Sequence, residues 1–438
     1  MGDTRRDQPA SAPAEDATRA PRDPFRFLMD LVRREGDVAR YRAGREPAFL
    51  VNDPDLIKRV LADNAANYSK ATAINGAFKR AVADGLLTSE GPLWRRQRRL
   101  MQPAFHRDRL SALAAQMTEA TVDMLERWHG IAARGETVDV AEEMSSLTLR
   151  ITVKALFGRD IADHVEAIGR RIADSIGLLV SESPSFEQAR VVVMDLLESI
   201  VREREQAPVE SPDLLGMLMQ ARDEDTGEPM GRRQLLDEML TLLLAGYETT
   251  ANALAWTWYL LSENPGPAAA LQAELRAVLG GRVPSVQDLP LLSYNRMVLE
   301  ESMRLYPPAW ILGRRAVADD MLGDHVIPAG SVVAISPYLM HRHPAHWEDP
   351  ERFDPERFTK ERSVGRKPFA YFPFGGGPRL CIGHNFAMLE AQLIIATVAQ
   401  HYLPRLLPGH TGEPQRLFVL RPRGGLPMRL GDSAASPN

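Results

Sequence analysis

The chain contains one cysteine, and the residues around it are suited to holding a reactive thiolate. Cys381 follows a run of glycines, Pro378 and Arg379, and Gly383 lies two residues after it. An apolar helical stripe begins near His384, so the cysteine is predicted to lie in a tight loop at a helix N-terminus. Free N–H groups and the positive end of the helix dipole favour a thiolate there, and Arg379 adds a positive charge. Taken alone, a buried cysteine in a glycine-rich turn is the more common explanation of such a pattern.

A second group of residues could handle protons inside an apolar helix. The sequence from about Gly231 to Ser262 can run as one unbroken helix, apolar on all sides in its second half, which predicts burial in a large protein. Glu248 is a carboxylate in this apolar stretch, where an unpaired charge is expensive. Thr249 shares a helix face with Leu242 and Ala245. The alternative is that the Thr249 hydroxyl bonds back to the Ala245 carbonyl and merely bends the helix.

The pattern around the cysteine resembles a known family. The spacing Phe374-x-x-Gly377-x-Arg379-x-Cys381-x-Gly383 resembles the haem-binding loop of the cytochrome P-450 superfamily at every defining position. The resemblance implies that Cys381 is the axial thiolate ligand of the iron in haem b (iron protoporphyrin IX). It also implies that Phe374, Arg379 and Gly383 help to bind this cofactor.

The same resemblance implies roles for residues of the apolar helix. Ala245–Thr250 is similar to the oxygen-activation segment of the family, an acid followed by threonine. Ala245 would leave room above the iron and border the cofactor. Thr249 would hold oxygen and an ordered water by hydrogen bonds, and Glu248 would feed protons from solvent. The Cys381 thiolate would donate electron density that favours O–O cleavage.

Several arginines are expected to bind the haem propionates. Trp94 and Arg98 share a helix face and resemble the family's helix that grips one propionate, although a basic helix alone is more often a solvated face. Arg314 is expected to bind the other propionate, judged by its distance ahead of the Ile327–Gly330 turn. Arg315 remains the alternative, because the adjacent arginines leave this register open.

The other arginines of the Trp94 helix point elsewhere. Arg95, Arg96 and Arg99 could form a positive patch for an acidic electron donor.

Two further motifs are expected to be structural. Glu301 and Arg304 share a helix face, and Arg357 follows in the segment Phe353–Phe358, in the order of a Glu-Arg-Arg lock that the family uses behind its haem loop. Three closely spaced histidines could bind zinc, but they resemble an ordinary family segment, so we expect no metal there. They are His341, His343 and His346.

The remaining sequence indicates the domain organisation, the fold class and the location of the protein. The 438 residues carry a net charge of −5, which gives no reason to expect nucleic acid as a partner. Residues 1–24 are expected to be a disordered tail and 25–438 one large haem-thiolate domain, mainly α with small β-sheets (α+β), in the P-450 fold. A short helix is predicted at Pro24–Glu35, a β-hairpin at Val38–Asp53, and late strands at Val326–Ser336 and Leu417–Leu430. The sequence has a single cysteine, and it shows neither a signal peptide nor a membrane-spanning segment. These features predict a cytoplasmic protein without membrane contact.

The expected function is insertion of one oxygen atom from O2 into an apolar or amphipathic small molecule, such as a fatty acid, terpenoid or other natural product. Electrons would come from a separate ferredoxin with its reductase or from a flavodoxin, and the protein would be a monomer. Pocket walls are expected at Ala71–Leu87, Ser181–Phe186, Ala309–Leu312 and the hairpin near Val419–Leu426. A haem sensor or carrier without turnover and a peroxide-driven oxidase are the alternatives. The intact Glu248-Thr249 pair argues against both.

Overall fold

The computed structural model describes residues 23–158, 184–206, 213–416 and 418–432. Of the predicted tail, residues 1–22 lie outside the described part of the chain. The first described helix, α1, spans Pro24–Glu35 as predicted. The side chain of Asp23 caps it by accepting the Arg26 N–H at 3.1 Å, and proline occupies the first turn, where its missing N–H costs nothing.

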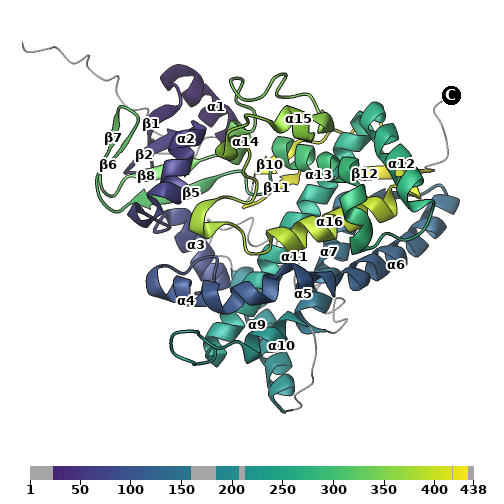
Figure 1. The fold of residues 1–438 in the computed structure, drawn as a ribbon, viewed down its shortest axis with the longest axis horizontal. Coiled ribbons are helices and arrows are strands. Elements are labelled where there is room, and N and C mark those ends of the chain that lie inside the picture. The colour runs from purple at the N-terminus through teal and green to yellow at the C-terminus, as the bar shows by residue number, and fades with distance from the viewer. Residues whose placement is uncertain (1–22, 159–183, 207–212, 417, 433–438) are drawn as a thin grey trace, which may run out of the picture.

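The predicted N-terminal hairpin forms and is extended by strands from the second half of the chain. β1 (Val38–Ala43) pairs antiparallel with β2 (Glu46–Val51), and β2 pairs in parallel with β8 (Val332–Ile335). β5 (Leu312–Ala316) and β3 (Tyr68–Ser69) complete the order β1-β2-β8-β5-β3. This sheet lies at one side of the helical body (Figure 1). It places Arg314 opposite Val333, one strand away from the N-terminal hairpin.

The late strands predicted at Leu417–Leu430 belong to two different sheets, so they do not pair with each other as the hairpin expected near Val419–Leu426. β11 (Leu420–Pro422) pairs with β10 (Pro414–Arg416), whereas β12 (Pro427–Asp432) pairs with β9 (Tyr402–Leu406) and β4 (Thr137–Asp139). The chain turns at Gly425, which has a φ of 82° and lies so close to Asp139 that a Cβ would overlap its carboxylate. The predicted strand at Val326–Ser336 also divides: β7 (His325–Ile327) pairs with β6 (Asp320–Leu322), and β8 joins the larger sheet.

The long helix predicted in the middle of the chain is α11, Arg232–Glu263. It packs against α7 (Val140–Phe157) and α16 (His384–Val398), and α16 crosses in front of it in Figure 1. Gly246 allows the approach to α7, because a Cβ there would lie 3.2 Å from Cγ2 of Thr152. The glycine in the helix centre therefore has a packing reason.

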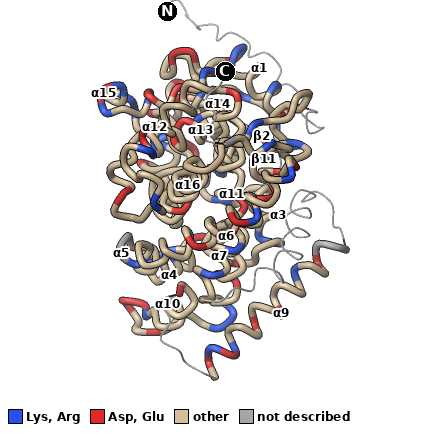
Figure 2. The backbone as a smooth tube through the Cα atoms, turned by 90° about the vertical axis from the view of Figure 1, so that its right-hand side faces the viewer, with Lys and Arg blue, Asp and Glu red and all other residues tan. Residues whose placement is uncertain are grey.

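The remaining helices surround this core. Basic and acidic residues alternate along α9, which extends from the lower part of the molecule (Figure 2). The bounds of these remaining helices are α2 Pro54–Lys58, α3 Ala73–Val82, α4 Gly91–Met101, α5 Arg107–Ser111, α6 Ala114–Ala133, α9 Pro184–Gln206, α10 Leu214–Gln220, α12 Pro265–Leu279, α13 Ser293–Leu305, α14 Pro337–Met340 and α15 Lys360–Ser363. Among the described residues, no helix combines the length and hydropathy that crossing a bilayer requires.

Candidate functional site

Cys381 lies in a loop that glycines allow to pack tightly. The loop runs from a short 3-10 turn, Gly377–Arg379, to the start of α16 at His384. The Cys381 N–H donates to the carbonyl of Phe374 at 3.0 Å, which closes the loop. Gly377 has a φ of 65°, and a Cβ there would overlap the carbonyl oxygen of Leu61. The glycine run is thus required for the loop to pass against the neighbouring backbone.

The Cys381 sulfur faces an interior space. The residue has exposed surface, yet burial raises the pKa of its thiol as the largest influence, so the exposed surface lies amid dense protein. The Gly383 N–H and the positive charge of Arg98 lower this pKa in the opposite direction. The nearby charge was expected from Arg379, but its guanidinium lies over the Trp94 ring at 4.0 Å. Arg98 is therefore the cation that acts on the sulfur.

α11 has partly exposed residues in the segment Ala245–Thr250, which the sequence analysis identified. Its residues are buried on both sides of this segment, but Ala245, Glu248 and Thr249 are only half-buried. Ile382, next to the cysteine, packs against the same core cluster as Leu242. The cysteine loop and this part of α11 therefore pack against one core cluster.

Within that segment the hydroxyl groups bond to their own helix. Thr249 Oγ1 donates to the Ala245 carbonyl at 2.9 Å, as in the structural alternative, and Thr250 Oγ1 donates to the Gly246 carbonyl at 3.2 Å. A hydroxyl has one proton to donate and two lone pairs, so Thr249 can still accept a hydrogen bond from a group in the interior space. The geometry thus leaves room for both explanations of this threonine.

Buried and half-buried cations gather beside the cysteine loop. Arg314 is 8% exposed and donates to the carbonyl of its neighbour Gly313, and burial lowers its pKa to about 10. Burial and the charge of Arg314 likewise lower the pKa of Arg379 to about 10, and the Arg379 Nη1 atom is buried with no hydrogen-bond partner among the described residues. Arg315 instead points outward to Glu46 at 2.7 Å and to the Gly330 carbonyl. The structure therefore brings Arg314, not Arg315, into the cluster.

Lys70 is a member of this cluster that the sequence analysis missed. Burial and the charges of Arg314 and Arg379 lower its pKa to about 7. Glu90 is the carboxylate that acts on these cations, and it also accepts the Lys70 backbone N–H. A lysine three residues before a helix carries no local signal of this role, because the cluster is assembled from segments far apart in sequence.

The cluster fits the haem that the resemblance implies. Cations removed from water are stable only when paired with anions, and among the described residues one carboxylate, Glu90, acts on Lys70, Arg314 and Arg379. The two propionates of haem b would supply the missing negative charge, and the Arg379 Nη1 atom would gain an acceptor. The exposed surface of Cys381 and the half-buried Ala245 would border the macrocycle.

Arg98→Ala should weaken haem retention more than Arg96→Ala. Arg98 Nη1 donates to the carbonyl of Leu380 at 2.8 Å, directly before the cysteine, whereas Arg96 turns away to Gln234 at 3.1 Å. Hydrogen bonds of charged groups contribute about 1.5–3 kcal/mol, so transfer of haem to apomyoglobin should be about ten- to a hundredfold faster in Arg98→Ala. Equal rates of haem transfer in the two variants would show that Arg98 has no specific role in haem retention.

Two of the three arginines expected to form a positive patch on α4 are bonded to neighbouring segments. Arg99 donates to the Asp223 carboxylate at 2.9 Å, and Arg96 donates to the carbonyl of Pro229 at 3.0 Å. Both side chains hold α4 to the connection between α10 and α11. Arg95 is the most exposed of the three.

The predicted Glu-Arg-Arg set assembles in the interior. Arg304 donates to both oxygens of Glu301, at 2.6 and 2.8 Å, with both side chains fully buried. Arg357 lies 3.3 Å from Glu301. Arg304 also donates to the carbonyl of His341 at 2.8 Å, and His341 Nε2 accepts the Phe372 N–H at 2.9 Å. The set is therefore joined through one histidine to the chain that enters the cysteine loop.

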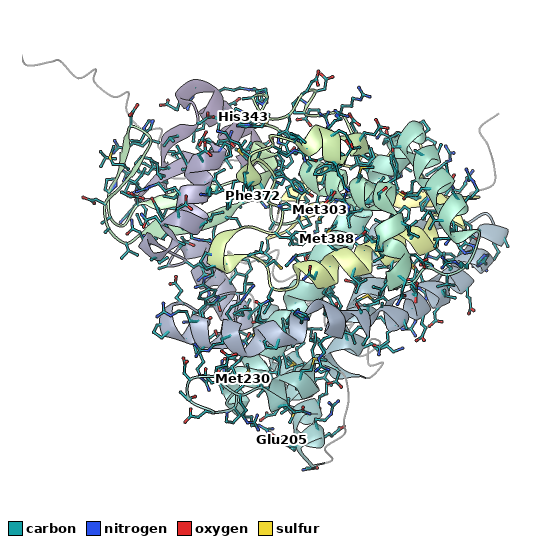
Figure 3. All side chains as sticks on the ribbon, in the orientation of Figure 1. Glu205, Met230, Met303, His343, Phe372 and Met388 are labelled. Carbon is teal, nitrogen blue, oxygen red and sulfur yellow. The ribbon has the colours of Figure 1, made fainter. Side chains whose placement is uncertain are left out.

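The three histidines considered as zinc ligands make other contacts. Burial and two nearby arginines hold the pKa of His341 well below its usual range, and its Nε2 is occupied by the Phe372 N–H. His343 contacts Asp37 at 3.0 Å toward the upper edge of the molecule, whereas Phe372 lies toward the centre (Figure 3). Within the described ranges no three potential metal-ligating side chains gather.

Comparisons with known proteins agree with this geometry. A family model described as cytochrome P450 matches residues 17–176 and 175–426. The chain is 38% identical over 411 residues to cyclooctatin synthase of Streptomyces melanosporofaciens, covering 90% of this chain and 88% of that protein. It is 33% identical to cyclooctat-9-en-7-ol 5-monooxygenase of the same organism, covering 89% and 87%. The solved P450DA heme domain matches with a TM-score of 0.87 and 25% identity, covering 93% and 92%.

The chain therefore belongs to the cytochrome P450 family and has the fold of that family, as the resemblance predicted. Haem b is the cofactor of this family. The protein is an oxidoreductase of the monooxygenase type, and such enzymes take their electrons from redox partners.

Proposed function

We propose that the protein inserts one oxygen atom from O2 into a terpenoid, with Cys381 as the axial ligand of the haem iron. The observation that carries the proposal is that the Cys381 loop and the part of α11 around Ala245–Thr249 pack against one core cluster, beside a cluster of cations short of anions. The terpenoid class is supported by two relatives, named for cyclooctatin and for the oxidation of cyclooctat-9-en-7-ol.

The bound haem supplies the activation of dioxygen, and the side chains around it supply positions and protons. Arg98, Arg314 and Arg379 would hold the propionates, and Phe374 and Gly383 would shape the loop around the Cys381 sulfur. Thr249, with its hydroxyl donating to the Ala245 carbonyl, would accept a hydrogen bond from a water in the interior space. Glu248 would bring protons to that water from solvent.

The predicted pocket walls support an apolar substrate with some revision. Phe78 of α3 packs edge-to-face on Phe418, so the first and last of the predicted walls meet. The last wall is moved by one residue: Val419 and Leu426 are buried, and Phe418 is the half-exposed side chain. Residues 181–183 of the Ser181–Phe186 wall lie outside the described residues. Large aromatic walls suit a bulky hydrocarbon skeleton.

Titration of the ferric haem with matched ligands tests the substrate class. Cyclic terpenoid alcohols, straight-chain fatty acids and polyketide lactones of similar size should be compared by the shift of the Soret band. We expect the terpenoid alcohols to bind at least about tenfold more tightly, because each tenfold step requires only about 1.4 kcal/mol of better apolar contact. Saturable shifts with fatty acids alone would contradict the terpenoid class.

The electron source and the competing functions need a second experiment. We propose a ferredoxin with its reductase, or a flavodoxin, as the donor. Product formation should require the donor and should incorporate isotopically labelled dioxygen. Turnover with peroxide and no donor would favour the peroxide-driven alternative, and binding spectra without any turnover would favour a sensor or carrier.

A further inference from the structure

The connection between α3 and α4, residues 83–90, is held against the first half of α11 by buried contacts. The Leu86 N–H donates to Oε2 of Glu238 at 2.8 Å, in a buried environment. Gly85 lies so close to α11 that a Cβ would overlap Oγ1 of Thr241. The backbone of the connection is therefore in direct contact with the helix over consecutive residues.

Glu238 is an unusual residue for this place. Its side chain has no exposed surface, and Oε1 has no hydrogen-bond partner in the described part of the chain. Burial raises its pKa to about 8, so the carboxyl is neutral at ordinary pH and avoids the cost of an unpaired buried charge. Positions 238, 242, 245 and 249 follow helical spacing along one face. Glu238 thus lies on the same side of α11 as Ala245 and Thr249.

The same connection is held from its other side. The Lys70 ammonium donates to the carbonyl of Leu87, and Gln97 of α4 donates to the carbonyl of Asp84 at 2.6 Å. Leu87 is half-buried and packs on the core cluster that includes α11. Ala83 has a φ of 55°, a conformation that a non-glycine residue keeps only where its surroundings enforce it.

We propose that Glu238 is a positioning residue for the substrate pocket, which fixes the Leu86 backbone through its carboxyl group and thereby sets Leu87 in the pocket wall. This inference rests on the proposed function only in taking Ala71–Leu87 as a wall. Without the acceptor, the Leu86 N–H is left buried and unpaired, and release of the connection relieves that cost. The contacts of Cys381 and Arg98 are made elsewhere and persist.

Hydrogen exchange of the connection is the first test, in the haem-loaded full chain. Glu238→Met removes the acceptor at similar volume, whereas Glu238→Gln keeps a neutral group of the same shape. We expect amides in residues 83–90 to exchange about tenfold faster in Glu238→Met and within about threefold of wild type in Glu238→Gln. Equal exchange in wild type and both variants overturns the proposal.

Binding of two azole ligands to the ferric haem is the second test. Imidazole needs access to the iron alone, whereas 4-phenylimidazole also contacts the wall. Glu238→Met should lower the affinity for 4-phenylimidazole by about tenfold and leave the affinity for imidazole unchanged. The band of the ferrous carbon monoxide complex should stay normal. General damage to the fold would weaken both ligands and alter the band, which would contradict a role confined to the wall.

Gly85→Ala provides a variant that leaves Glu238 intact. Its Cβ forces the connection away from Thr241, so it should reproduce the faster exchange and the selective loss of 4-phenylimidazole. It also replaces Glu238→Met if that variant does not fold. A Gly85→Ala protein with wild-type exchange and affinity would overturn the inference. Neither test uses a terpenoid, so a wrong substrate class leaves its outcome unaffected.

Discussion

Cys381→Ser should abolish the red-shifted Soret band of the ferrous carbon monoxide complex. An alcohol does not ionise at neutral pH, so serine cannot supply the electron-donating thiolate that produces this band. The effect should be complete, because the protein has no other cysteine. Reduced protein under carbon monoxide should be compared with wild type in a difference spectrum.

The fold should survive this substitution. The loop is closed by the backbone bond from Cys381 to Phe374, and the tight approach of Gly377 to Leu61 involves no sulfur. Circular dichroism and the unfolding temperature should therefore remain close to those of wild type. A normal red-shifted band in a well-folded Cys381→Ser protein would remove Cys381 as the ligand.

Elements with strong local patterns could be predicted from the sequence. The helix at Arg232–Glu263 is indicated by the length of its unbroken apolar second half, and the hairpin at Val38–Val51 by alternation around a turn. Residues with fixed spacing were also found: Glu301 and Arg304 pair as the i, i+3 rule requires. In each case the information lies within a few residues.

Contacts between distant segments could not be predicted in this way. Arg96 and Arg99 looked like free cations on a basic helix, but their partners lie more than 120 residues away, across the α10–α11 connection. Lys70 enters the cation cluster because β3 pairs with β5 and brings it beside Arg314. Spacing also left Arg314 and Arg315 equivalent, and strand alternation decides between them. Such pairings depend on which strands become neighbours, and a single sequence does not determine that.

Thr249→Val should uncouple reductant consumption from product formation. Valine keeps the shape of threonine but cannot accept or donate a hydrogen bond, so the water in the interior space would lose a partner. Haem, carbon monoxide and substrate should still bind, because Thr249 is not among the residues that hold them. Reduced oxygen should leave as hydrogen peroxide, and product per electron pair should fall steeply. General acid–base assistance is typically worth about 10²–10⁴-fold, which sets the upper scale of the loss.

Thr250→Val is the matched control. Thr250 also donates from its hydroxyl to the carbonyl four residues earlier, but its side chain is buried and bonds to the buried Glu390 carboxyl group, whereas Thr249 is half-exposed to the interior space. A role in helix bending predicts lower thermal stability in both variants, with product and peroxide in their original ratio. A role in proton delivery predicts uncoupling in Thr249→Val alone.

Thr249→Ser separates the hydroxyl from the methyl group. Serine can still donate to the Ala245 carbonyl and accept from a water, so it should recover most of the coupling lost in valine, although its freer rotamer should make recovery incomplete. Reductant consumed, peroxide released and product formed should be measured together in all variants with one substrate that gives a binding spectrum. If serine and valine are equally uncoupled, shape rather than hydrogen bonding matters at this position. If valine is fully coupled, proton delivery falls to Glu248 and water without this threonine.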